Sequence, residues 1–118
     1  MLDGWRGEVF AALYGAEGER LWEPAVYRPE ELAERVTSLG EVPSVAGSGA
    51  VRFRKELTCD GVRIADDSDP VHRVAARHLC AIAAAAAGEN ESEQLAPIYL
   101  RPPDAERWRE RDAFQKAQ

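Results

Sequence analysis

The stretch DGWRGEVFAALY, residues 3–14, decides the fold class of this chain. It predicts a strand over Trp5–Tyr14, entered through a turn at Gly4 and Gly7. From Val9 onward, alternate side chains are apolar on both faces of the extended chain. Such a strand is typical of a sheet that is covered on both sides. We therefore expect this segment to lie within the core of a sheet-containing fold.

A second strand follows at once and predicts a β-hairpin. The glycine-rich segment 15–19 is a turn, and Leu21–Tyr27 returns as the exit strand. Pro24 lies within that strand and cannot donate a hydrogen bond to a neighbour, which favours an edge position or an irregularity. The hairpin is therefore predicted to stand at one side of the sheet.

Helical and extended segments alternate after the hairpin. Pro29 opens a helix with Glu30 and Glu31 in its first turn, and Gly40 ends it. The later predictions are a short strand over 42–46, a helix over 50–57, a brief strand over 62–64, a helix over 69–87 and an extended segment over 95–100. This order predicts an α/β fold in which helices pack on one mixed sheet.

The helix over 69–87 is predicted to belong to the core. Asp69 is its expected N-cap and Pro70 its first helical residue. Its expected inward face is Val71, Val74, Ala75, His78, Leu79 and Ile82. Cys80 is interpreted as a small core residue. Residues 1–103 then form one domain, and the charged segment 104–118 forms a frayed or partly helical tail.

Composition excludes several classes of function. The chain has 118 residues, 45% of them hydrophobic and 31% charged, which is typical of one globular domain. A formal net charge of −6 opposes a non-specific hold on nucleic acid, so no direct nucleic-acid partner is expected. There is neither an apolar run of the roughly 20 residues that cross a bilayer nor a signal-peptide pattern, and a cytoplasmic protein without membrane attachment is predicted.

Three stretches resemble the TsaB family, which acts in bacterial tRNA threonylcarbamoyladenosine synthesis. Residues 3–14 are similar to the DARRGEVYAALY strand of that family, with Gly4 and Trp5 in place of Ala-Arg. VAGSGA, residues 45–50, is similar to its V-G-x-G-A turn before a helix. LAPIYLRPPDA, residues 95–105, is similar to its closing L-x-P-x-Y-L-R-x-P-D-A. The three together span most of the chain.

The resemblance implies an actin-like (ribonuclease-H-like) lobe that has no catalytic residues of its own. In the family, historically labelled glycoprotease or peptidase M22-like, the chemistry belongs to a partner, TsaD, and an ATPase, TsaE, joins the assembly. Family members begin with a further lobe that pairs with TsaD, and nothing here matches it. Residues 1–103 are therefore expected to correspond to the C-terminal lobe, with an incomplete first strand because only Met1 and Leu2 precede Asp3.

The sharpest candidate binding site is Gly47-Ser48-Gly49, between a predicted strand and a predicted helix. Glycines let a ligand approach the backbone, and a helix N-terminus offers free N–H groups to an anion. The equivalent turn of the catalytic relative reads G-G-V-x-x-N and holds a nucleotide, but the Asn is absent here. A plain tight turn and a residual nucleotide-binding module both remain open, and no cofactor is predicted.

The tryptophans are candidate partner contacts. Trp5 and Trp22 flank the hairpin, and they either pack together, which we favour, or form a contact surface. Trp108 lies in the charged tail and is a candidate contact with another chain. A homodimer, or a homo-oligomeric structural domain, is a further alternative. The two Cys and two His residues match no metal-ligand spacing, so no metal site is expected.

Overall fold

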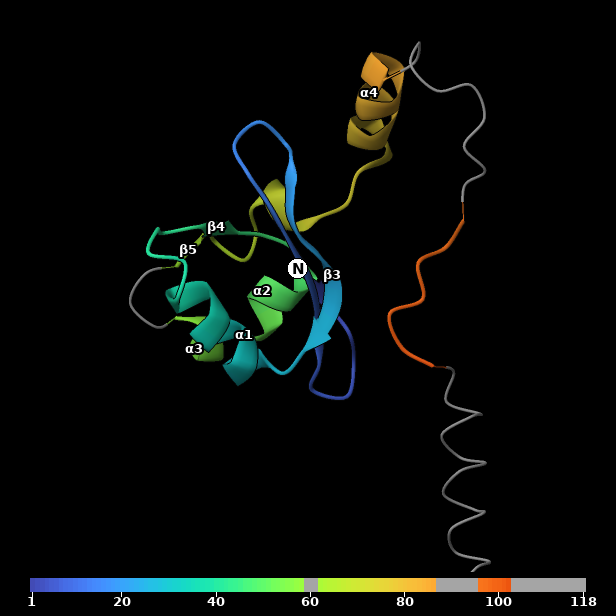
Figure 1. Ribbon diagram of the computed structural model, residues 1–118. Helices are drawn as coiled ribbons and strands as arrows, with labels where there is room; N and C mark the ends of the chain where they lie inside the picture. Colours follow the sequence, from blue (N-terminus) through green and yellow to red (C-terminus); the bar gives the residue numbers. More distant parts are fainter. Residues whose placement is uncertain (59–61, 87–95, 103–118) are drawn as a thin grey trace, which may run out of the picture.

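The computed structural model describes residues 1–58, 62–86 and 96–102 (Figure 1). Three antiparallel strands form one sheet in the order β1 (Leu2–Asp3), β2 (Val9–Tyr14) and β3 (Arg20–Tyr27). A second sheet pairs two short parallel strands, β4 (Ser44–Val45) and β5 (Arg63–Ile64). The helices are α1 (Pro29–Thr37), α2 (Ser48–Arg52), α3 (Arg54–Leu57) and α4 (Ala76–Ala86), with a 3₁₀ turn η1 (Pro70–His72).

The α/β class is confirmed, but the strands of the described residues form two sheets instead of one mixed sheet. The hairpin is also confirmed. Val9 lies opposite Tyr27, and Leu13 lies opposite Trp22, with a shift in register between these pairs. Because β3 is an outer strand of its sheet, Pro24 stands at an edge as predicted.

The core lies between the hairpin and the first three helices. Alternation along β2 turns Val9 and Ala11 to the same face, and both are buried. Leu32 and Val36, one turn apart on α1, meet that face. The buried cluster is Val9, Ala11, Leu32, Ala33, Val36, Phe53 and Leu57. The opposite face of β2 is only partly covered, since Phe10 and Ala12 are half-buried and Tyr14 is exposed.

The single helix predicted over 69–87 is wrong. Asp69 does act as a cap, because its carboxylate accepts a hydrogen bond from the Val71 N–H at 2.8 Å. Only η1 follows, however, and the backbone is extended at Arg73 before α4 begins at Ala76. Two hydrogen bonds hold the His72 ring to Gly47 and Ala65, and the backbone becomes extended at the next residue, Arg73.

The predicted inward face of this segment is also wrong. The large apolar side chains of the segment are exposed: Val71, Val74, Leu79 and Ile82. Cys80 is exposed as well, so it is no core residue. Figure 1 shows α4 set apart from α1, α2 and α3, which gather beside the hairpin. Alanine has the highest intrinsic helix propensity, which favours a helical conformation in this segment.

No helix among the described residues is long and apolar enough to cross a membrane. The predicted charged tail over 104–118, Trp108 and Cys59 lie outside the described residues.

Candidate functional site

The turn Gly47-Ser48-Gly49 leads into α2, and steric constraints require glycine at its first and third positions. Gly47 has φ +106° and ψ 174°, a conformation open to little besides glycine. A Cβ atom at Gly47 would overlap the carbonyl oxygen of Met1. One at Gly49 would lie 3.0 Å from the carbonyl of Leu2. The turn therefore needs glycine because β1 passes directly over it.

The polar groups of this turn bond to the chain itself. The Gly49 N–H donates to the Met1 carbonyl at 3.3 Å, and the Met1 amino group donates to the Ala46 carbonyl at 2.6 Å. The Asp3 N–H donates to the Ser48 hydroxyl at 3.1 Å. A tight turn against β1 accounts for all of these contacts. The residual nucleotide pocket stays a prediction.

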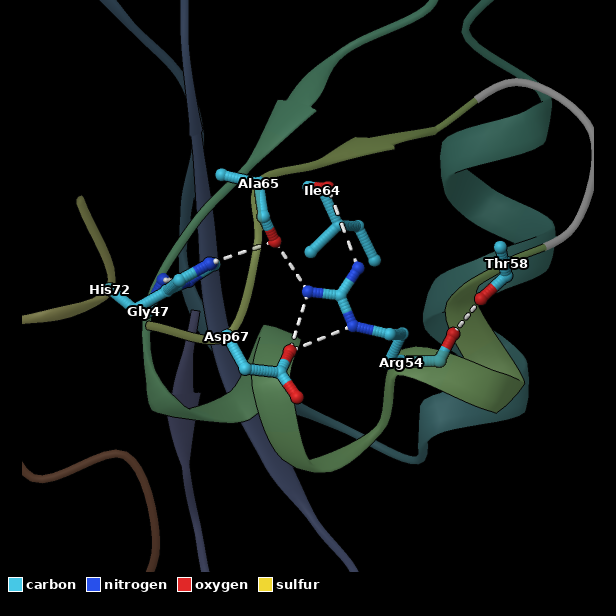
Figure 2. Close-up of polar contacts among 7 residues, drawn as sticks. All are labelled: Gly47, Arg54, Thr58, Ile64, Ala65, Asp67 and His72. Carbon is cyan, nitrogen blue, oxygen red and sulfur yellow. Dashed lines mark hydrogen bonds and ion pairs between the residues drawn. The ribbon is translucent and has the colours of Figure 1, made fainter. Parts of the chain in front are cut away.

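His72 joins the turn to the segment after β5, as Figure 2 shows. His72 is 8% exposed, its Nδ1 accepts from the Gly47 N–H at 3.1 Å, and its Nε2 lies 3.2 Å from the Ala65 carbonyl oxygen. Since Nδ1 accepts from an N–H, Nε2 carries the proton and donates to Ala65. His72 is thus a buried histidine with both ring nitrogens hydrogen-bonded.

Arg54 completes the same network. Its Nε and Nη2 contact one Asp67 carboxylate oxygen at 2.9 and 2.6 Å, and Nη2 also donates to the Ala65 carbonyl (Figure 2). As part of the basic stretch Arg52-Phe53-Arg54-Lys55, Arg54 is predicted to lie on a solvated face, so sequence reasoning misses this role. The signal in the sequence that could have indicated this ion pair was the acidic segment 66–69, whose Asp67 lies thirteen positions after Arg54. We interpret the network as a structural tie between α3 and the chain after β5.

A second ion pair holds β1 against α2. Arg52 Nη1 lies 2.7 Å from Asp3 Oδ2, and Asp3 Oδ1 accepts the Trp5 N–H at 3.0 Å. Partial burial acts to raise the pKa of the Asp3 carboxyl, but the Trp5 N–H and the Arg52 guanidinium outweigh it and lower that pKa below its ordinary value. The carboxylate form of Asp3 is therefore the one that the fold stabilises.

Asp3→Asn is expected to remove a pH-dependent part of the stability. A carboxyl whose pKa is lower in the folded state contributes fully above its unfolded pKa of about 3.9. The contribution is lost as the pH falls through the lower folded pKa. Urea unfolding from neutral pH down to about pH 3 should show the wild type more stable, with a gap that narrows in acid. A gap that stays constant with pH would contradict this role of the charge.

The tryptophans do not pack together as predicted. Trp5 is 71% exposed in the turn before β2, with φ +58°. Trp22 lies opposite Leu13, near the other end of β2, and is half-buried. The guanidinium carbon of Arg35 lies 4.3 Å from the centroid of the Trp22 ring. The two tryptophans are kept apart because they lie near opposite ends of β2. Trp5 remains a candidate contact, whereas Trp22 is explained by its cation–π pair.

Residues 96–102, here called the strap, lie on the other side of the hairpin from α1 (Figure 1). Arg101 forms a 2.7 Å ion pair with Glu8, and its guanidinium lies 5.5 Å from the Phe10 ring centroid. A cavity of about 800 Å³, here called the slot, is bounded by residues 10–14 on β2, residues 43–46 around β4, part of α1 and the strap.

The described side chains form no candidate metal site. Within residues 1–58, 62–86 and 96–102, no three His, Cys, Asp or Glu side chains cluster so that they could hold a metal ion. The chain matches no model of a known protein family, and a search of curated proteins finds no match to it.

Proposed function

We propose that the chain is a non-catalytic scaffold lobe of a TsaB-like protein, with an actin-like (ribonuclease-H-like) fold. It would serve the transfer of a threonylcarbamoyl group to adenosine in tRNA, with the chemistry carried by a TsaD-like catalytic subunit and a TsaE-like ATPase in the same assembly. The strand order supports the fold assignment. An antiparallel β1–β2–β3 unit, a helix and then β4 is the order expected of such a lobe.

One observation carries the proposal: the three stretches that resemble the family meet in space. The glycine turn packs against the first stretch, because the Asp3 N–H donates to the Ser48 hydroxyl at 3.1 Å and a Gly49 Cβ would lie 3.1 Å from Val9 Cγ1. Arg101, from the closing stretch, pairs with Glu8, from the first stretch. The residues that carry the resemblance therefore hold distant parts of the chain together. Residues used in this way support a structural role better than a catalytic one.

Binding to the catalytic subunit tests the proposal. The chain, alone and joined behind the N-terminal lobe of a TsaB protein, would be captured with a purified TsaD-like subunit, with and without the TsaE-like ATPase. We expect the two-lobed form to bind and the chain alone to bind weakly or not at all. Failure of both forms to bind would overturn the proposal. Binding by the chain alone would place a pairing surface on this lobe.

Trp5→Gly is the variant that probes such a surface. Trp5 has a left-handed backbone, which costs a non-glycine residue about 1–2 kcal/mol. Glycine removes that cost but gains entropy in the unfolded chain, so the melting temperature should stay within a few degrees of wild type. If Trp5 contacts the partner, capture by the two-lobed form falls while stability does not. Leu21→Ala, another exposed apolar side chain, is the matched control.

A further inference from the structure

His72 is the only buried residue in the described segment 66–85, which follows β5. Every other residue of that segment is half-buried or exposed. The His72 ring lies between the turn at Gly47 and the main chain at Ala65, and it is bonded to both (Figure 2). These two hydrogen bonds, here called the His72 link, join η1 to the start of α2 and to the chain after β5.

The His72 link uses the neutral form of the imidazole ring. Nδ1 accepts the Gly47 N–H while Nε2 donates to the Ala65 carbonyl, so one of the two nitrogens must lack a proton. A protonated ring has two N–H donors and no acceptor. Turning the ring over exchanges the two nitrogens but does not restore an acceptor. Proton uptake is therefore incompatible with the bond to Gly47.

No anion is placed to stabilise a charged imidazole at this position. Both ring nitrogens bond to main-chain groups, and within the described residues no carboxylate contacts either of them. Asp67 is paired with Arg54, and the Asp69 carboxylate accepts the Val71 N–H. The charged groups on the elements around the ring are the Met1 amino group, Asp3, Arg52, Arg54, Asp66, Asp67, Asp69 and Arg73.

Two cations lie near the bonds that the ring makes. Arg54 Nη2 donates to the same Ala65 carbonyl that His72 uses, so the guanidinium lies beside the ring (Figure 2). The Met1 amino group donates to the Ala46 carbonyl, directly before the Gly47 N–H. A positive charge beside a titrating group disfavours a second positive charge there. The surroundings of the ring thus favour the same neutral form that its hydrogen bonds require.

We propose that the His72 link is a pH-sensitive switch, closed while the ring is neutral and opened when the ring takes up a proton. In the open state η1 detaches from the turn at Gly47. The ion pair between Arg54 and Asp67 does not involve the ring and stays formed. His72 is not a member of the buried apolar cluster, so the core stays intact. The switch goes beyond the scaffold function and does not depend on it.

The sign of the pH effect follows from the number of protons that each state holds. The closed link leaves Nδ1 without a proton, whereas an imidazole in water takes one up at a pH near 6.5. Acid therefore favours the open state, by a factor of about ten between pH 7.5 and pH 5.5. The loss of the Asp3 charge occurs at lower pH and does not overlap with this range.

Hydrogen exchange at the Gly47 amide measures the link directly, because exchange requires the bond to Nδ1 to open. In the full chain labelled with ¹⁵N, the protection factor of this amide should fall about tenfold from pH 7.5 to pH 5.5. The Phe53 amide, which donates to the Gly49 carbonyl, should keep its protection factor. An equal loss at both amides would mean that acid loosens the whole domain, and it would overturn the proposal.

His72→Asn separates the ring from the other titrating groups. The asparagine oxygen accepts an N–H as Nδ1 does, but asparagine does not titrate, so Gly47 should show equal protection at both pH values. His78→Asn changes an exposed histidine on α4 and should behave like wild type.

A tenfold loss that persists in His72→Asn would assign the effect to another group, such as the Met1 amino group, whose pKa is lowered by burial. That result would overturn the switch. Unchanged protection of Gly47 in the wild type would overturn it as well, and this measurement decides the matter even if His72→Asn does not fold.

Discussion

Gly47→Ala should reduce the free energy of unfolding by about 3 kcal/mol or more, or prevent folding altogether. The conformation of Gly47 alone costs a residue with a side chain about 1–3 kcal/mol. The added Cβ would also overlap the Met1 carbonyl oxygen, a backbone atom that cannot rotate away as a side chain does. Relief of that overlap requires β1 to move off the turn, which removes its bonds to Ala46 and Ser48.

Urea unfolding followed by circular dichroism measures this loss, and Gly40→Ala is its matched control. Gly40 also has a positive φ, +71°, but a Cβ there would meet nothing within 4 Å. It should therefore show only the conformational cost, about 1–2 kcal/mol. If both variants lose the same stability, β1 does not press on the turn as described.

Leu57→Ala should lower the free energy of unfolding by about 2–5 kcal/mol, the usual cost of truncating a buried leucine. Leu57 is fully buried in the cluster that joins α3 to α1 and β2. Its replacement by alanine removes three carbon atoms from the buried cluster and leaves a cavity there. The same unfolding measurement gives the size of the loss.

Leu79→Ala tests the correction of the C-terminal helix by the same chemical change. Leu79 is 58% exposed on α4, and its truncation should change stability by no more than about 0.5 kcal/mol. A loss as large as that of Leu57→Ala would show that α4 packs against the body in solution, as its sequence pattern predicts.

Local patterns predicted the elements that local forces decide. The hairpin follows from alternation in residues 9–14 and a glycine turn, and Asp69 caps η1 as a short-range contact would suggest. The start of α1 at Pro29 is equally local. The failures lie where a local preference needs a distant partner. The pattern over 69–87 indicates which side chains share a helix face, but not whether anything lies opposite that face.

The candidate site divides in the same way. A strand–glycine–helix turn at Gly47–Gly49 was visible in the sequence, because glycine marks a backbone that other residues cannot adopt. The sequence did not indicate that β1 packs against this turn, because Met1 and Gly47 are 46 positions apart. The tie between Arg54, Ala65 and His72 was hidden for a further reason: it ends on a backbone carbonyl, and every residue type has one.

The sequence by itself determined the α/β class, the hairpin, the first helix and the glycine turn, since each depends on residues within a few positions of one another. Only the tertiary structure decided that β1 crosses the turn, that α4 stands apart, and that residues of β2 and β4 line one cavity. Those features depend on which surfaces meet after the chain has folded back on itself. Short-range periodicity carries no information about such meetings, because it is the same whether or not a partner is present.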